Sequence, residues 1–455
     1  MSLRTRSGAT RLIFALVLTM LLVSGCATVN TQGAGGHPAI QQARALVQSG
    51  TALSGSARKA NDQQIEKLIA GLDNPTLARE AAALKAGDPI YNYVGRALLR
   101  RGLALPRPFD RGAWRFNAGN RPAAESDGYR PPVKLAVLLP LSGSLATVAG
   151  PVRDGLLAGY YGESRRRPEI IFYDTVGSAA GALSAYDKAV AEGNDFVVGP
   201  LGRDEVGALF ARASLPVPLL ALNRSSQNPP AGNASFSLSP EDEGLAAAEY
   251  LVGRGARRVL AIASDDDSQR RAVVALRQRL TERGGALIDT VGEGTSDFAP
   301  FAQKGVDAVF IATKGSTART LMPKLALAGL GDKPRVATSQ LLAGTGKADQ
   351  DRLLDGIAFP IETFNNRAVQ GLPSASSVGA TLPSARGPGA KLFAFGYDAW
   401  LLTAYLEHLA LSADGHVNGA TGTLRIDGFG NVQRMPAWST FSGGQAVPLA
   451  DASRR

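Results

Sequence analysis

The stretch LPLSGSLATVAGPVRDGLLAGYY, residues 139–161, has the order of a strand end, a glycine-containing turn and a helix. The apolar run that leads into it, residues 133–139, is interrupted only by Lys134 and is typical of a buried strand. A turn of this kind presents backbone N–H groups, which can bind an anion or a small polar solute. A nucleotide site is not supported, because the glycines do not follow G-x-G-x-x-G and no Lys-Ser/Thr pair follows them. The stretch predicts the first strand–turn–helix unit of an α/β sheet.

The same alternation continues through residue 340. Continuous apolar runs predict strands at 133–140, 169–175, 195–200, 217–223, 257–264, 286–291, 307–313 and 335–340. Helical patterns lie between them, near 151–163, 179–192, 203–213, 241–254, 267–284 and 316–328. This order predicts a doubly wound α/β fold with parallel sheets. One eight-stranded sheet is an alternative, but the extended piece that opens residues 235–251 favours two sheets in two hinged lobes.

The end of the chain returns to the earlier layers. Residues 370–390 are rich in Gly, Pro and Ser and are expected to be flexible. A long helical pattern at 391–410 and a β-rich end follow. Late returns of this kind are what a two-lobe hinged protein requires.

The N-terminus has the features of an export signal. Three arginines precede an apolar run at residues 12–23, which is too short to span a bilayer comfortably. The motif LVSGC then places small residues before Cys26, as in a bacterial lipobox, in which the cysteine is lipidated. Cys26 is the only cysteine of the chain, so it cannot form an internal disulfide or a Cys-based zinc site. We expect a lipoprotein signal peptide at 1–25 and a lipidated tether at 26–37; the alternative is a chance cysteine after an ordinary signal peptide.

The residue after this cysteine and the distribution of charge bear on location and partners. Ala27 is not acidic, which is typical of default outer-membrane sorting in Gram-negative lipoproteins and predicts the periplasmic face of that membrane. The net charge of +10 is concentrated near the N-terminus, since residues 26–130 hold 14 basic and 8 acidic side chains. In an exported protein this excess indicates a solvated basic face or a surface for an acidic partner, and no nucleic-acid partner is expected.

Two segments lie between the tether and the α/β region. Residues 38–102 carry apolar side chains at three- and four-residue spacing, which predicts about four short helices in two hairpins. Residues 103–132 are rich in Pro, Gly and Arg without a period. They are interpreted as a linker, or as an arm that lies on the next domain.

Candidate binding residues follow from the strands. In open parallel sheets a ligand binds outside the carboxyl ends of the strands, and small polar residues and glycines gather there in this chain. The alternative is that these are ordinary βα turns, which favour the same residue types. The candidate cleft residues are Ser142, Gly143, Gly199, Pro200, Leu201, Asn223, Ser225, Ser264, Asp265, Thr313 and Ser339, with Tyr397 and Asp398 from the aromatic-acid cluster of the late helix. For that cluster, core packing is the alternative.

Catalytic patterns are absent from the sequence. The three histidines form no H-x₃-H cluster, and there is no G-x-S-x-G elbow. The acidic run at residues 265–267 is better explained as the start of a helix than as a metal site. We therefore expect no enzyme, no cofactor and no metal.

Several stretches together resemble one family. KLAVLLPLSGSLATVAGPVRDGLLAGYY, FVVGPLGRDEV, SLSPEDEGLAAAEYL, FAFGYDAWLL and GATGTLRIDGFGNVQRMPAWSTFSGG are similar, in collinear order over about residues 131–450, to the LpoA (LppC/YraM) lipoproteins. That family comprises outer-membrane activators of penicillin-binding proteins. More distantly, the same region resembles the type I periplasmic binding proteins for branched-chain amino acids.

The resemblance implies a fold and a set of partners. It implies a TPR-like helical N-domain and, at 133–455, a two-lobed domain like type I periplasmic binding proteins, with two doubly wound parallel sheets. We expect lobe 1 at about 133–238 and 341–418, and lobe 2 at about 239–340 and 419–455. The implied partner is a class A bifunctional penicillin-binding protein, with peptidoglycan as a further contact. The helical segment is shorter than the family's, which leaves that contact open.

The expected function is therefore non-catalytic allosteric activation of peptidoglycan synthesis. The alternative is a periplasmic solute receptor for a small polar ligand, amino acid-like or a muropeptide, in transport or sensing. The strand ends differ from those of amino-acid receptors and no second-lobe tyrosines match, so an α-amino acid is not favoured.

Overall fold

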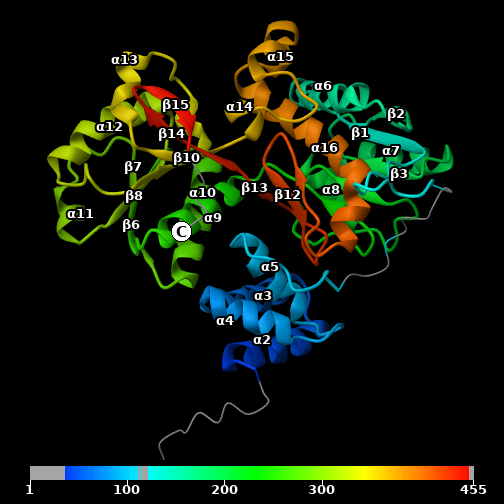
Figure 1. The fold of residues 1–455 in the computed structure, drawn as a ribbon, viewed down its shortest axis with the longest axis horizontal. Coiled ribbons are helices and arrows are strands. Elements are labelled where there is room, and N and C mark those ends of the chain that lie inside the picture. The colour runs from blue at the N-terminus through cyan, green and yellow to red at the C-terminus, as the bar shows by residue number, and fades with distance from the viewer. Residues whose placement is uncertain (1–35, 111–113, 115–120, 450–455) are drawn as a thin grey trace, which may run out of the picture.

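The computed structural model describes residues 36–110, 114 and 121–449. They form a short helical segment below two α/β lobes that lie side by side (Figure 1). The predicted export signal, Cys26 and most of the predicted tether lie outside the described residues. Within the described residues, no helix is both long enough and apolar enough to cross a membrane.

The helical segment has four α-helices. They are α2 (Pro38–Ser49), α3 (Gly55–Ala70), α4 (Asn74–Ala83) and α5 (Tyr91–Arg100), as the spacing predicts. Their apolar sides enclose one small core that includes Ile65, Leu77 and Val94, each fully buried. Pro75 lies in the first turn of α4, where Asp73 caps the helix by accepting a hydrogen bond from the Thr76 N–H.

The first lobe is built on an all-parallel five-stranded sheet of order β2-β1-β3-β4-β5. Its strands are β1 (Lys134–Leu139), β2 (Glu169–Asp174), β3 (Phe196–Val198), β4 (Leu219–Ala221) and β5 (Ala234–Ser235). The helices α6 (Ala146–Gly162) and α16 (Pro388–Leu411) cover one face, and α7 (Ala179–Ala191) and α8 (Arg203–Phe210) cover the other. Alternate residues of β1 face the two layers, which explains why the strand is a continuous apolar run.

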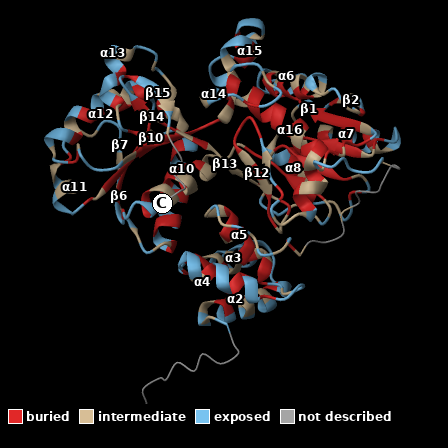
Figure 2. Cartoon of the chain, in the orientation of Figure 1, coloured by how far each residue is buried: buried red, intermediate tan, exposed pale blue. Residues whose placement is uncertain are grey.

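The second lobe has a seven-stranded sheet of order β15-β14-β10-β9-β8-β6-β7. Its strands are β6 (Arg258–Ala263), β7 (Ala286–Gly292), β8 (Ala308–Ala312), β9 (Arg335–Ala337), β10 (Ala358–Ile361), β14 (Ala437–Ser442) and β15 (Gln445–Pro448). Its helices are α9 (Pro240–Gly253), α10 (Asp267–Glu282), α11 (Ala299–Gln303), α12 (Gly315–Leu327) and α13 (Ala348–Asp351). The strands from β6 to β10 are parallel, whereas β14 and β15 add antiparallel strands at one edge. Figure 2 shows that burial is concentrated on the strands and on the helix faces that cover them.

A third sheet, of β11 (Val417–Asn418), β12 (Thr423–Ile426) and β13 (Val432–Met435), lies beside the first lobe. Leu424, Ile426 and Val432 of its β12–β13 hairpin belong to the first-lobe core. The chain passes between the lobes after β5, after β10 and after β13.

The expected lobe boundaries need two corrections. Residues 341–418, expected in lobe 1, include β10, which is a strand of the second sheet. Residues 419–455, expected in lobe 2, include β12 and β13, which pack on the first lobe. Sheet membership is set by pairing with strands distant in sequence, and neither the short β10 run nor a two-stranded hairpin encodes its partner locally.

Two connecting segments are more ordered than their composition indicates. Residues 370–390, expected to be flexible, contain α15 (Ala375–Thr381) and the first turn of α16, and α14 (Thr363–Asn366) precedes them. The C-terminal end of the predicted linker is packed: Arg130 donates to both carboxylate oxygens of Glu407 on α16, and the Tyr129 hydroxyl donates to the Arg166 carbonyl. These contacts agree with the arm interpretation for residues 129–130.

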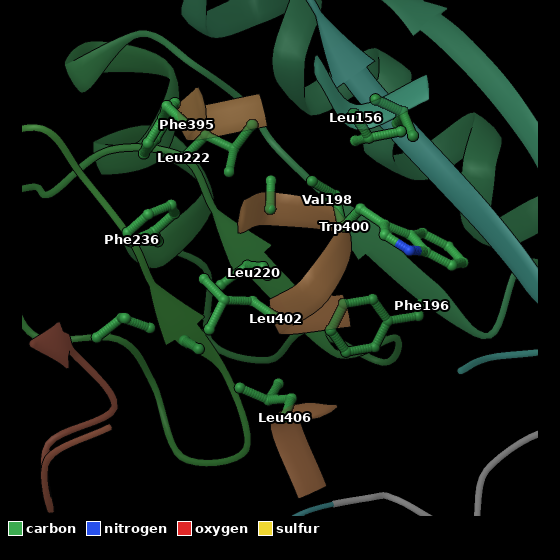
Figure 3. Packing of buried hydrophobic residues seen from close by; sticks show 14 of the residues in the cluster. Leu156, Phe196, Val198, Leu220, Leu222, Phe236, Phe395, Trp400, Leu402 and Leu406 are labelled. Carbon is green, nitrogen blue, oxygen red and sulfur yellow. The ribbon is translucent and has the colours of Figure 1, made fainter. Parts of the chain in front are cut away.

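The glycines of residues 139–161 allow helix α6 to pack closely against helix α16. Helices α6 and α16 cross so closely that a β-carbon on Gly155 would overlap the Phe393 carbonyl oxygen, and one on Gly396 would overlap that of Val152. Beside this crossing, Trp400, Leu402 and Leu406 of α16 pack against Phe196, Val198 and Leu220 of the sheet (Figure 3). The glycine spacing thus serves helix packing and not phosphate binding.

We expect Gly155→Ala to lower the free energy of unfolding by about 1–3 kcal/mol, because the added methyl must push two backbones apart. Gly253→Ala is the control: it is an exposed glycine at the end of helix α9 with nothing within 4 Å of the new β-carbon and no proline after it. It should stabilise the protein by up to about 1 kcal/mol through helix propensity. Urea unfolding of both variants measures the contrast, and equal effects at the two positions would contradict the close crossing.

Candidate functional site

The first turn of α9 carries three consecutive acids, Glu241, Asp242 and Glu243, here called the acidic turn. A helix N-terminus favours negative side chains electrostatically. Pro240 sets the start of the helix, directly after the chain has crossed from the first lobe to the second. This position makes the acidic turn a meeting point for basic side chains of both lobes.

Each acid of this turn has a basic partner. Glu241 binds Arg271 of α10 within the second lobe, with both oxygens 2.8 Å from guanidinium nitrogens. Asp242 binds Arg224, which follows β4 of the first lobe, at 2.8 and 3.1 Å. Two-point contacts of this kind fix orientation as well as distance, so the Asp242–Arg224 pair links the two lobes in one geometry.

Glu243 makes the most connected contact. Its Oε1 accepts from Lys391 Nζ and from the Ser339 hydroxyl, both at 2.8 Å, and its Oε2 accepts from the Ser339 N–H at 2.8 Å. Lys391 Nζ also lies 3.4 Å from Glu362 Oε1. Lys391 comes from α16 of the first lobe, Ser339 follows β9, and Glu362 directly follows β10. The cluster therefore joins both lobes beside a crossing point of the chain.

Burial and pairing shift the pKa values of these groups in opposite directions. Burial alone would raise the pKa of Glu243, but Lys391 and the Ser339 donors lower it below its usual value. Burial would lower the pKa of Lys391, and Glu243 with Glu362 raises it. Likewise, Arg271 and Ser239 overcome the effect of burial and lower the pKa of Glu241 to about 2. Glu241, Glu243 and Lys391 are therefore charged at neutral pH.

The helical segment contacts both lobes. Arg96 of α5 binds Glu66 of α3 at 2.5 Å, and its guanidinium lies 4.1 Å from the ring centre of Phe429 in the β12–β13 hairpin. Arg283, which follows α10 in the second lobe, donates to the Ala70 and Leu72 carbonyls at the end of α3. Burial alone would raise the pKa of Glu66. The nearby cations Arg96, Arg100 and Arg279 overcome this effect and lower that pKa to about 2. The segment is thus a third body fixed to both lobes.

The first-lobe candidates lie at the strand ends as expected, but their polar groups are used locally. Ser142 and Gly143 are exposed, and Asp174 holds their turn by accepting from the Leu141, Ser142 and Val176 N–H groups. Asn223 donates to the Leu201 carbonyl, which ties together the loops after β3 and β4. At Gly199 the φ of +100° requires glycine, and a β-carbon would overlap the Leu138 carbonyl. Pro200 is buried beside it, and Ser225 bonds within its own turn to Gln227.

Of the second-lobe candidates, Ser339 belongs to the Glu243–Lys391 cluster. Ser264 and the exposed Asp265 lie in the turn before α10, where the Ser264 hydroxyl donates to Asp266. Thr313, directly after β8, is buried, and its hydroxyl donates to the Lys314 carbonyl. The described residues contain no group of His, Cys, Asp or Glu arranged to hold a metal ion.

The late cluster is structural and not part of a cleft. Asp398 is completely buried and accepts from the Ala420 and Thr421 N–H groups and the Thr421 hydroxyl. The Tyr397 hydroxyl donates to the Gln370 carbonyl. The prediction that Tyr397 and Asp398 line the cleft is therefore wrong, and the alternative of core packing holds for both residues. Nearby, α6, α15 and α16 enclose a shallow, mainly apolar cavity of about 410 Å³ that includes Leu372, Val378 and Phe393.

Sequence reasoning missed most of the inter-lobe cluster. Arg224, Asp242, Glu243, Glu362 and Lys391 are surface-type residues that no motif singles out. The available signal is SPEDEG, residues 239–244: three acids in the first turn of a helix that starts where the chain changes lobe. Three adjacent acids indicate that cationic side chains lie nearby, but the sequence does not predict that two of these cations come from the other lobe.

Comparison with known proteins identifies relatives of the two-lobed region. The family described as "LppC putative lipoprotein" matches residues 129–292 and 295–444. The "Penicillin-binding protein activator LpoA" of Photobacterium profundum is 29% identical over 358 residues, covering 70% of this chain and 57% of that protein. The chain thus spans about half the length of the curated relatives it matches.

Two solved structures resemble the fold. The "LpoA (YraM) C-domain from Haemophilus influenzae, a regulator of PBP1A" has a TM-score of 0.62 at 21% identity, over 70% of this chain and 100% of that chain. A "putative branched-chain amino acid ABC transporter from Chromobacterium violaceum ATCC 12472" has a TM-score of 0.56 at 26% identity, over 68% of this chain and 100% of that chain. The predicted α/β fold, two-lobed and like periplasmic binding proteins, is confirmed.

Proposed function

This chain belongs to the LppC lipoprotein family, and from that membership we propose that it binds and activates a class A bifunctional penicillin-binding protein. The observation that carries the proposal is the family match across nearly the whole two-lobed region, together with the alignment of 70% of the chain to a relative named as an activator. Activation is regulatory in this proposal: contacts with the synthase favour its active conformation and thereby promote peptidoglycan synthesis. The protein itself catalyses no step.

The proposal includes the location of the protein. Lipidation of Cys26 would anchor it to the outer membrane and leave the folded part in the periplasm. The lipobox-like LVSGC motif and the lipoprotein family support this placement. Residues 26–37 form the tether in this arrangement, residues 38–102 the helical segment, and peptidoglycan is a further contact on the way to the synthase.

The inter-lobe contacts favour a protein partner over a small solute. A solute receptor of this fold opens and closes about its cleft, and its strand ends carry free polar groups for the ligand. In this chain the Asp242–Arg224 pair and the Glu243–Lys391 cluster join the lobes, and Asn223 and Ser339 use their polar groups internally. A fixed relation between the lobes suits a docking surface, which has to present the same shape to a folded partner each time.

The proposal is tested by adding the purified full chain to a purified class A synthase with lipid-linked substrate. We expect the two proteins to co-purify and the yield of cross-linked glycan to rise above that of the synthase alone. An unrelated periplasmic protein of similar size is the control. Absence of both binding and stimulation would refute the proposal. In a parallel thermal-shift series, a saturable shift with an amino acid or a muropeptide would instead support the solute-receptor alternative.

A further inference from the structure

Two buried carboxylates converge on a single ammonium group between the lobes. The side chains of Glu243 and Glu362 are 9% and 5% exposed, and one oxygen of each lies 2.8 and 3.4 Å from Lys391 Nζ. The Ser339 hydroxyl lies 3.1 Å from the same nitrogen. An ammonium has three N–H donors, and here it has three oxygen neighbours. The site is therefore formed to receive an ammonium group.

The placement of this site is that of a ligand site. Ser339 follows β9 and Glu362 follows β10, so both lie at carboxyl ends of parallel strands, where open α/β sheets bind ligands. The donor to this site comes from the other lobe, from the first turns of α16. The second lobe supplies the acceptors, and the first lobe supplies the cation.

The charge balance argues that the cation is required. Without Lys391, two carboxylates with little access to water would face each other, and burying unpaired charges is costly. Arg434 acts on the same region, because it lowers the pKa of Lys391 by repulsion. Its guanidinium donates to the Thr421 carbonyl at 3.3 Å, whereas the ion pairs of Glu243 and Glu362 among the described residues are made with Lys391.

We propose that this is an alkylammonium-binding site and that Lys391 is its built-in ligand. The lysine side chain occupies the place at the strand ends that a solute would take, and in doing so it joins the first lobe to the second. The site goes beyond the proposed activator function and does not depend on which synthase is bound.

The test removes the built-in ligand and supplies it from solution. Lys391→Ala deletes the three methylenes Cγ, Cδ and Cε together with the ammonium on Cε, and n-propylammonium returns a three-carbon chain with its ammonium. The Lys391 side chain is 30% exposed, so a small amine can reach the vacated space. We expect Lys391→Ala in the full chain to lower the melting temperature by several degrees, and n-propylammonium chloride to restore at least half of that loss in a saturable manner.

Three controls separate binding from general effects of the additive. Propan-1-ol has the same chain without the charge and should not restore stability. The wild-type protein should not shift, because its site is filled. Lys188→Ala removes an exposed lysine whose neighbour is Glu192 on the same helical stretch, and it should neither lose stability nor respond to the amine.

The outcomes are decisive in both directions. An equal amine response of the wild type and Lys391→Ala, or no response of a folded Lys391→Ala variant, would overturn the proposal. If Lys391→Ala does not fold, Lys391→Met keeps the aliphatic stem and removes only the charge. That variant should be less stable than the triple variant Lys391→Met, Glu243→Gln, Glu362→Gln, in which the unpaired carboxylates are also removed. A Lys391→Met protein as stable as the wild type would overturn the proposal as well.

Discussion

Asp398→Ala is expected to lower the free energy of unfolding by about 3 kcal/mol or more, one of the two largest losses in this protein. The carboxylate is completely buried and accepts three hydrogen bonds, from the Ala420 N–H at 2.5 Å, the Thr421 N–H at 2.8 Å and the Thr421 hydroxyl at 2.5 Å. Alanine would leave two buried backbone donors and one hydroxyl without an acceptor, and each such group costs about 1–3 kcal/mol. Urea unfolding measures the loss.

Asp355→Ala is the matched control for this prediction. Asp355 also accepts from two consecutive backbone N–H groups, those of Gly443 and Gly444, both at 2.9 Å, but it is only half-buried. Water can replace its carboxylate, so the expected loss is about 1 kcal/mol or less. Equal losses in the two variants would show that burial of Asp398 does not set the cost.

The Asp398 effect has a pH dependence of defined sign. Burial raises the pKa of Asp398 to about 7, against the effect of the three donors. In the unfolded chain the pKa of this group is about 3.9. Between about pH 4 and pH 7, Asp398 is therefore protonated in the native protein and ionised in the unfolded chain. The stabilising contribution of Asp398 therefore falls as the pH rises from about 4 to about 7. The difference between wild type and Asp398→Ala should be larger at pH 5 than at pH 8.

The regular elements could be predicted from the sequence because their signals are local. Every expected strand from 133–140 to 335–340 is present, since buried parallel strands appear as continuous apolar runs and the helices between them have their own periodicity. The sequence does not predict strand β10. Its four residues include Pro360, and a proline argues against a central strand. In the structure Pro360 nevertheless lies within the sheet, opposite Trp438 of the antiparallel strand β14.

The candidate site could be predicted only in part, for a related reason. Ser339 was found because it follows a strand, and strand ends are fixed once the strands are known. Glu243, Glu362 and Lys391 lie on three elements that come together only when the chain crosses between lobes. Their meeting depends on contacts 148 and 52 residues apart in the chain, between Lys391 and Glu243 and between Lys391 and Ser339, which local patterns do not contain. Asp398 was predicted to lie in the cleft because the same sequence pattern, an acid between aromatic residues, occurs both in binding clefts and in buried cores.

The other large effect is expected at Arg96, which fixes the helical segment to the first lobe. Its guanidinium binds Glu66 at 2.5 Å, lies 4.0 Å from the completely buried Asp427, and stacks over the Phe429 ring. Arg96→Ala breaks the closer of the two ion pairs of Glu66, which keeps Arg100 at 3.4 Å, and removes the cation that lies near Asp427. Breaking a buried pair costs about 3–5 kcal/mol, and the remaining Arg100 places the expected loss at the lower end, about 3 kcal/mol. Because Arg96 joins α5 to α3 through Glu66 and also contacts Asp427 and Phe429 of the β12–β13 hairpin, α5 and the hairpin should loosen before the lobes themselves unfold.

Hydrogen exchange measures this local opening. A loss of about 3 kcal/mol corresponds to roughly 100-fold faster exchange of the amides of α5 and of the hairpin around Asp427, while β1 and β6 should keep their protection. Arg44→Ala is the matched control, since Arg44 binds Asp88 at 2.8 Å in the same segment but is 37% exposed, where a pair contributes about 1 kcal/mol or less. Faster exchange in both variants alike would indicate general loosening of the segment. Unchanged exchange around Asp427 in Arg96→Ala would show that the segment is held by its other contacts, such as those of Arg283 with the end of α3.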